Sequence, residues 1–266
     1  MSGTAVGGAG GLGLLAVVVV GWFLGVDLTP LLNGGGPVGG QTGGSSQITQ
    51  ADEEAAQFVS VTLADTEEVW ARVFREQVGE AYDPATLVLF KGVTQSPCGG
   101  ASGATGPFYC PADRKVYLDT AFFTTMQRQL GAGGDFAAAY VVAHEIEHHV
   151  QDELGILAQT TAMRQRMPEA DANALSVRVE LQADCFPGLW ARGAQAQFGT
   201  LEPGDVEEAM NAASRIGDDA LQRGAGRVPR PESFTHGTSA QRQRWFQTGY
   251  DSGDITACDT FGAQQL

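Results

Sequence analysis

The stretch FAAAYVVAHEIEHHVQDEL, residues 136–154, is the most informative segment of this 266-residue chain. Its alanines and apolar residues favour a helix, and Gly155 is a typical residue for the end of one. The segment contains the spacing HExxH, which begins at His144. Because positions four apart share one face of a helix, His144 and His148 can offer two imidazole nitrogens to one zinc ion. Glu145 lies on the same turn and can reach a water molecule on that metal.

Two further polar residues of this helix, Glu147 and His149, need a separate interpretation. The apolar run before the motif predicts a buried helix, where a polar group without a partner is costly. His149 points about 100° away from His148 around the helix, so we expect a structural role with a hydrogen bond to a neighbour. Two placements are open to Glu147. It either raises the pKa of Glu145 by like-charge repulsion or points away from the ligands.

A hydrolytic zinc site keeps three protein ligands and one open position, so a third ligand is expected elsewhere in the chain. Glu180 and Asp184 lie four residues apart in a predicted helix over 169–198. We expect Glu180 to complete the zinc site and Asp184 to hold a histidine ligand from behind. The alternative is a carboxylate pair on the helix surface. Pro187 is expected to interrupt this helix, because proline lacks a backbone donor.

The rest of the chain predicts more helices and only a few strands. Apolar residues at helical spacing mark the helices, and alternation marks the strand KVYLDT. The strands precede the HExxH helix, which indicates an α+β fold, mostly helical with one small sheet. The predicted elements are one or two helices over 51–81, one helix each over 204–222 and 239–250, N-caps at Asp65 and Asp205, and strands over 86–92 and 115–120.

The four cysteines are Cys98, Cys110, Cys185 and Cys258. None has the close CxxC spacing of a structural zinc ribbon. Cys98 and Cys110 flank a glycine-rich loop that a disulfide would close, which leaves Cys185 to pair with Cys258. We therefore expect two disulfides and an oxidising compartment. Four reduced, buried thiols are the alternative.

Residues 6–26 carry no charge and reach the ~20 residues that span a bilayer. We expect a membrane anchor over 1–28, a Gly/Ser-rich linker over 29–47 and a catalytic domain over 48–266. A cleaved signal peptide is the alternative, but a basic n-region and a small-residue cleavage site are both missing. Since no Lys or Arg precedes Arg72, orientation rests on the cysteines. They predict a single-pass protein of the cell membrane with an extracytoplasmic catalytic domain.

The balance of charge argues against nucleic acid as a partner. The chain has 16 Lys and Arg against 31 Asp and Glu, a net charge of −15. Such an acidic surface repels a phosphate backbone.

His236 lies in the loop SFTHGTS, just before the last predicted helix. One hypothesis is that it donates a hydrogen bond to the oxyanion of the transition state. The alternative is that it caps the helix that begins at 239. On that helix, Arg242, Arg244 and Trp245 are predicted to form a solvated face with one aromatic anchor and without chemistry.

Five blocks of sequence, in order along the chain, closely resemble the bacterial neutral zinc metallopeptidase family. The resemblance covers about residues 50–260. It implies a zincin-type fold and a single zinc ion with His144, His148 and Glu180 as ligands. It also implies Glu145 as the catalytic carboxylate and an N-terminal membrane anchor with an extracytoplasmic catalytic domain. The blocks are GPFYCPADRKVYLD, YVVAHEIEHHVQ, VRVELQADCFPGLWA, GDVEEAMNAASRIGDDALQ and ESFTHGTSAQRQRWF.

The expected function is a membrane-anchored peptidase that hydrolyses peptide bonds with metal-activated water, using one zinc ion per chain. Its partner is a peptide or protein substrate, which by analogy with zincins would add to KVYLDT as a sheet edge. The alternative is an impaired pseudo-peptidase that binds proteins. Glu147, where the family motif usually has Gly, and Pro187 motivate it. Glu147 pointing away and Pro187 lying beyond the zinc site would favour the enzyme.

Overall fold

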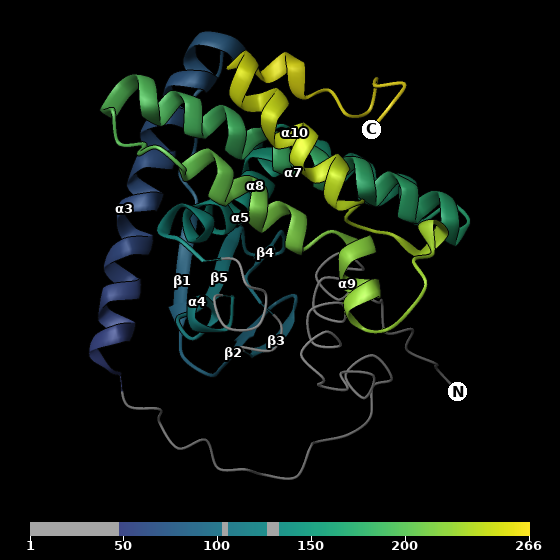
Figure 1. Ribbon diagram of the computed structural model, residues 1–266. Coiled ribbons are helices and arrows are strands. Elements are labelled where there is room, and N and C mark those ends of the chain that lie inside the picture. Colours follow the sequence, from purple (N-terminus) through teal and green to yellow (C-terminus); the bar gives the residue numbers. More distant parts are fainter. Residues whose placement is uncertain (1–47, 103–105, 127–132) are drawn as a thin grey trace, which may run out of the picture.

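The computed structural model describes residues 48–102, 106–126 and 133–266. In this part of the chain, every strand lies before the HExxH helix and most helices lie above the strands in Figure 1, which confirms the mostly helical α+β fold. The predicted anchor over 1–28 and the linker over 29–47 lie outside the described residues. Among the residues that are described, no helix is both long and apolar enough to cross a membrane.

The main sheet has three strands in the order β1-β5-β4. β1 (Thr86–Phe90) is parallel to β5 (Lys115–Asp119), and β4 (Phe108–Cys110) is antiparallel to it. β2 (Val93–Ser96) and β3 (Gly99–Ser102) form a separate hairpin. The strand KVYLDT is therefore central, and its prediction as a sheet edge is wrong. β1 pairs with β5 along its whole length, and β4 pairs with Lys115, Val116 and Tyr117 on the other side.

α3 (Gln50–Val73) is one long helix that continues as a π-helical turn, Phe74–Val78. It begins with a capping box between Thr49 and Asp52. The N-cap predicted at Asp65 is wrong, because the buried residues of α3 lie both before and after that position along a single helix. The chain then turns at Gly79, which adopts a left-handed conformation.

α5 (Asp135–Glu153) is the predicted HExxH helix, and it is buried along most of its length. Its alanines and Tyr140 pack in the main core with α3 and α7. Gly155 adopts a positive φ of 72°, as a residue after a helix end often does. A short helix follows, α6 (Ile156–Arg164), and leads into α7 (Glu169–Phe198).

α7 runs without a break through Pro187, so the predicted interruption is wrong. The helix is held by close packing against α10 (Ser239–Ser252), which crosses it in Figure 1. A Cβ added at Gly188 would lie 2.0 Å from the carbonyl oxygen of Phe246, so the two backbones touch there. A proline inside a helix costs about 3 kcal/mol or more, yet α7 remains helical through Pro187.

The segment predicted as one helix over 204–222 is two, α8 (Asp205–Arg215) and α9 (Asp218–Gly224). The break falls at Gly217, where an added Cβ would lie 2.3 Å from the backbone nitrogen of Ser239. The helix is therefore interrupted at Gly217, where the start of α10 packs against the backbone. The N-cap of α8 is Gly204 rather than Asp205.

The four cysteines form the two predicted disulfides. Cys98–Cys110 joins the turn of the β2–β3 hairpin to β4. Cys185–Cys258 joins α7 to a 3-10 turn, Ile255–Cys258, that follows α10. The second bridge therefore fastens the C-terminal segment to the helix that carries Glu180.

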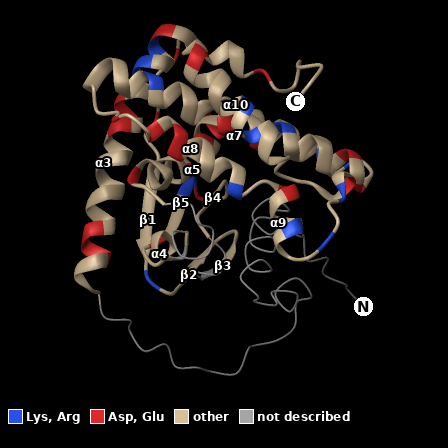
Figure 2. Cartoon of the chain, in the orientation of Figure 1, with Lys and Arg blue, Asp and Glu red and all other residues tan. Residues whose placement is uncertain are grey.

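The acidic residues are distributed rather than gathered in one patch. Figure 2 shows Asp and Glu on α3, α7 and α9, with fewer Lys and Arg between them. The absence of a nucleic-acid partner stays a prediction from this charge.

Candidate metal centre

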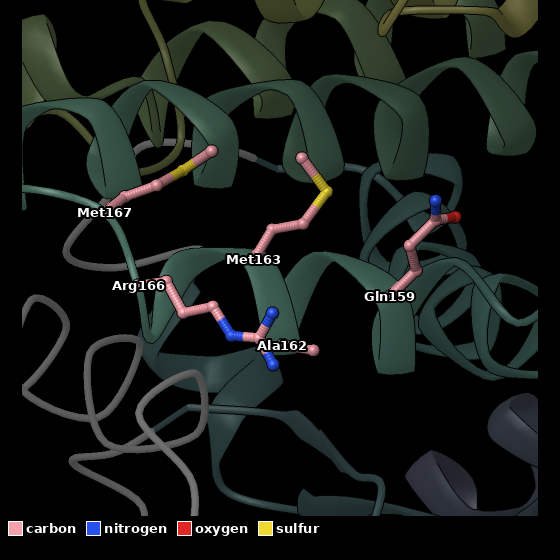
Figure 3. Close-up of a pocket in the computed structure, with 5 residues that line it drawn as sticks. All are labelled: Gln159, Ala162, Met163, Arg166 and Met167. Atoms are coloured by element: carbon pink, nitrogen blue, oxygen red, sulfur yellow. The ribbon is translucent and has the colours of Figure 1, made fainter.

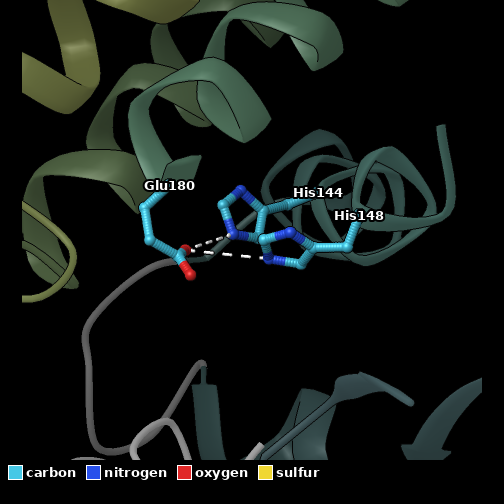
Figure 4. Close-up of side chains that lie close together, drawn as sticks. All are labelled: His144, His148 and Glu180. Atoms are coloured by element: carbon cyan, nitrogen blue, oxygen red, sulfur yellow. Dashed lines mark hydrogen bonds and ion pairs between the residues drawn. The ribbon is translucent and has the colours of Figure 1, made fainter. Parts of the chain in front are cut away.

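The three predicted ligands, His144, His148 and Glu180, meet between α5 and α7 (Figure 4). Nε2 of His144 lies 3.3 Å from Oε2 of Glu180, and Nε2 of His148 lies 3.7 Å from the same oxygen. The three ligand atoms lie within 4.8 Å of one another. His144 and Glu180 are buried, and His148 is half-buried. The packing of two helices thus brings Glu180 to the two histidines, although it lies 32 positions after His148 in the sequence.

These residues fit a zinc ion. A tetrahedral ion with ligands at about 2.0–2.2 Å holds them roughly 3.3–3.6 Å apart, close to the two distances given. Two imidazoles and one carboxylate are also a common donor set for a catalytic zinc ion that keeps one position open. Burial alone would lower the pKa of His144, but Asp184 and Glu180 raise that pKa to about 10. The site therefore favours a positive charge, which a metal ion provides.

Glu180 remains ionised although it is buried. Burial by itself would raise the pKa of its carboxyl group, but His236, His148 and His144 together bring that pKa well below its usual range. A carboxylate ligand is needed in its charged form, so the surroundings of Glu180 suit metal binding.

Asp184 lies behind His144, as predicted from the sequence. Its Oδ1 is 3.1 Å from Nδ1 of His144, at an angle poorer than that of a good hydrogen bond. Tyr140 donates its hydroxyl to Asp184, and Arg242 donates Nε and Nη2 to the two carboxylate oxygens at 2.7 and 2.8 Å. Burial would raise the pKa of Asp184, but Arg242 and His144 lower it below its usual value.

Arg242 is therefore not part of a solvated face, and that prediction is wrong. Its exposed fraction is 2%, and Nη1 also donates to the carbonyl of Ile216 at 3.1 Å. Trp245 is buried as well, and only Arg244 lies at the surface. A signal was present in the sequence, because Arg242, Trp245, Phe246 and Gly249 follow the i, i+3, i+4, i+7 spacing of a buried helix face.

Glu145, the predicted catalytic carboxylate, is half-buried on the turn between the two histidines. Within the described part of the chain, its side chain has no hydrogen bond or ion pair with a protein group.

Glu147 points away from the ligands, which decides between its two open placements. It is fully buried, and its Oε1 accepts a hydrogen bond from Nε1 of Trp70 on α3 at 3.0 Å. Burial raises the pKa of Glu147 well above its usual value, and Trp70 and His144 only partly oppose this. Glu147 therefore lies outside the group of predicted ligands.

His149 has the structural role that was predicted for it. Its Nε2 lies 2.6 Å from the carbonyl of Asp83, and its Nδ1 lies 3.3 Å from the hydroxyl of Tyr109 on β4. These contacts fasten the motif helix to the sheet.

His236 is close enough to Glu180 for their charges to interact, and it lies in a loop that Asp218 organises. Oδ2 of Asp218 accepts backbone N–H groups from Thr235, His236 and Gly237 at 2.7, 2.7 and 3.0 Å. Nδ1 of His236 lies 3.5 Å from Oδ1 of Asp218. Burial would lower the pKa of His236, but Glu180 and Asp218 raise it. The N-cap of α10 is Thr238, so His236 does not cap that helix. Nothing local in the sequence marks Asp218 as its partner.

A cavity of about 400 Å³ lies along α6, lined by Gln159, Ala162, Met163, Arg166 and Met167. Met163 and Met167 point toward the neighbouring helix (Figure 3). None of these lining residues is one of the three predicted ligands, and we assign the cavity no role.

Comparison with known proteins places the chain in a family. The model of the family described as "Putative neutral zinc metallopeptidase" matches residues 1–261. The uncharacterized protein YpfJ of Escherichia coli (strain K12) is 52% identical over 256 residues, which cover 96% of this chain and 88% of the relative. The uncharacterized protein Mb2605 of Mycobacterium bovis is 45% identical over 195 residues, which cover 70% of this chain and 65% of the relative. No solved structure matches the chain. The chain therefore belongs to the neutral zinc metallopeptidase family.

Proposed function

We propose that this protein is a zinc-dependent peptidase, with one zinc ion held by His144, His148 and Glu180. The observation that carries the proposal is the buried meeting of these three side chains in a chain of this family. When bound, the zinc ion supplies Lewis acidity that polarises a peptide carbonyl and makes water acidic near neutral pH. The fit of the donor set and the charge of the site support this assignment.

Glu145 is the general base in this proposal. It takes the proton of the attacking water and passes it to the leaving amine. Its position on the turn between His144 and His148, without a protein partner among the described residues, supports the role. Glu147 is hydrogen-bonded to Trp70 on α3 and is directed away from the ligands, so it does not take part in this proton transfer.

His236 is proposed to donate a hydrogen bond to the developing oxyanion. Its Nδ1 faces the carboxylate of Asp218, so Nε2 donates in the doubly protonated imidazolium, the form that the raised pKa of His236 favours. Such donors commonly contribute ~3 kcal/mol to transition-state stabilisation. If His236→Ala binds zinc and keeps the wild-type kcat, this role is excluded.

Both residues that suggested a pseudo-peptidase lie away from the three ligands, which favours the enzyme. Glu147 is directed toward α3 rather than into the site. Pro187 lies about two turns beyond Glu180 in an unbroken helix. Neither residue is among the three ligands.

We also propose that residues 1–28 anchor the protein in the cell membrane, with the catalytic domain outside the cytoplasm. The two disulfides support an oxidising compartment for that domain. In spheroplasts that carry the full chain, externally added protease should digest the domain, and deletion of residues 6–26 should release the protein from the membrane fraction. Protection of the domain from that protease would contradict the proposed orientation.

The test of the activity is Glu145→Gln in the full chain, with turnover measured on a broad peptide library. We expect the variant to bind one zinc ion but to lose about 10²–10⁴-fold in turnover. His144→Ala is the matched control, because it should lose the metal as well. A variant that cleaves like the wild type would exclude the mechanism. A zinc-loaded wild type that cleaves nothing in a chelator-sensitive way would favour the binding domain.

A further inference from the structure

The second histidine of the motif is held by a buried glutamine from its own helix. Nδ1 of His148 lies 2.9 Å from Oε1 of Gln151. Residues three apart face the same side of a helix, so Gln151 reaches this nitrogen without distortion. An imidazole that donates Nδ1–H keeps its lone pair on Nε2. In His148 that Nε2 is the atom facing Glu180.

The amide of Gln151 can adopt only one orientation. Its side chain is fully buried, and Nε2 donates to the carbonyl of Val179 at 2.8 Å and to Oε1 of Gln182 at 3.0 Å. A flipped amide would place Oε1 against the carbonyl of Val179, which has no proton to donate. Oε1 of Gln151 must therefore face His148 as an acceptor.

The next glutamine is fixed in the same way. Nε2 of Gln182 donates to the carbonyl of Cys258 at 3.1 Å, and a flip would oppose two oxygens there. Cys258 is itself bonded to Cys185 on α7. The pair Gln151 and Gln182, here called the amide relay, thus ends on two backbone carbonyls that can only accept.

We propose that Gln151 is a positioning residue for zinc binding, and that the amide relay sets the tautomer and direction of His148 before the metal arrives. The inference rests on the proposed zinc ligands. It assigns the two histidines different supports, because His144 is held by the charged Asp184 and His148 by neutral amides. Removing a side chain that hydrogen-bonds a metal ligand typically weakens metal binding about 10–100-fold.

The experiment compares Gln151→Met with the wild type in the full, oxidised chain. The Kd for zinc is measured by competition with a coloured chelator. We expect zinc to bind about 10–100-fold more weakly to Gln151→Met. Gln182→Met should cause a smaller loss, because Gln151 keeps its bond to Val179. Thr160→Val is the matched control for a lost buried hydrogen bond, since Thr160 bonds only to carbonyls of its own helix, and its Kd should not change.

A second readout separates positioning from general stability. In the metal-free chain, nitrogen NMR should show His148 protonated on Nδ1 in the wild type and a mixture of tautomers in Gln151→Met. This measurement stays decisive if the wild type binds zinc without cleaving peptides, or binds no zinc. Should Gln151→Met fail to fold, Gln182→Met tests the relay. An unchanged Kd together with an unchanged tautomer in a folded variant overturns the proposal.

Discussion

Two fully buried carboxyl groups, Asp184 and Glu147, lie close to the motif helix and behave in opposite ways. Both have an exposed fraction of 0%. Asp184 accepts two bonds from Arg242 and one from Tyr140 and lies next to His144, and its pKa is lowered. Glu147 accepts one bond from Trp70, its second oxygen has no partner, and its pKa is raised.

The difference shows that burial does not decide whether a carboxyl group is charged. Burial raises the pKa of both groups, and the charged donors around Asp184 reverse that effect. Asp184 can therefore orient the ring of His144 so that its Nε2 binds a cation. Glu147 is bonded to Trp70 on α3 and stays outside the group of ligands, which explains how the motif accommodates a glutamate at 147.

The largest expected effect comes from removing the guanidinium beside Asp184. Arg242→Met leaves a buried carboxylate without its charged partner and should lower the free energy of unfolding by about 3–5 kcal/mol. Urea denaturation of the metal-free protein measures this. The double variant Asp184→Leu, Arg242→Met removes both charges and should recover part of the loss. A single variant as stable as the wild type would show that the pair does not keep Asp184 charged.

The next effect concerns metal binding and sets the two carboxyl groups against each other. Asp184→Asn keeps the shape but removes the charge behind His144, so the Kd for zinc should rise about 10–100-fold. Glu147→Gln is the matched substitution on the other side, and it should leave that Kd unchanged. Equal losses of affinity in both variants would break the comparison.

A smaller effect is expected for the contact between Trp70 and Glu147. Trp70→Phe removes the donor to Glu147, and the same change made in a Glu147→Leu background has no such bond to lose. A double-mutant cycle in urea should give a coupling energy of about 0.5–1.5 kcal/mol. A coupling energy of zero would mean that the hydrogen bond contributes nothing.

The smallest effect should come from Asp52, a carboxylate at the start of α3 whose partner Lys91 keeps contact with solvent. Lys91, Thr49 and Thr120 hold the pKa of Asp52 below its ordinary value of 3.8. A lowered folded-state pKa adds stability above that ordinary value and loses it as the pH falls. The wild type should therefore exceed Asp52→Asn in stability at neutral pH, with a difference that shrinks below pH 3.8. A difference independent of pH would exclude this charge effect.

Much of the candidate metal centre could be predicted from the sequence because its residues come in helical pairs. A spacing of four residues places His144 with His148 on one helix face, and Glu180 with Asp184 on another. The two disulfides and the α+β fold were predicted correctly as well. In each case the deciding information lies within one helix or in the count and spacing of a residue type.

Only the tertiary structure decided which groups meet across elements. It placed Arg242 behind Asp184, Asp218 under the His236 loop and Trp70 against Glu147. It also made β5 central and carried α7 through Pro187. The physical reason is that helical periodicity defines which residues share a face, whereas the partner of that face depends on how whole elements pack. Sequence alone thus predicted the candidate ligands as a set, and packing determined which donors surround each buried carboxyl group.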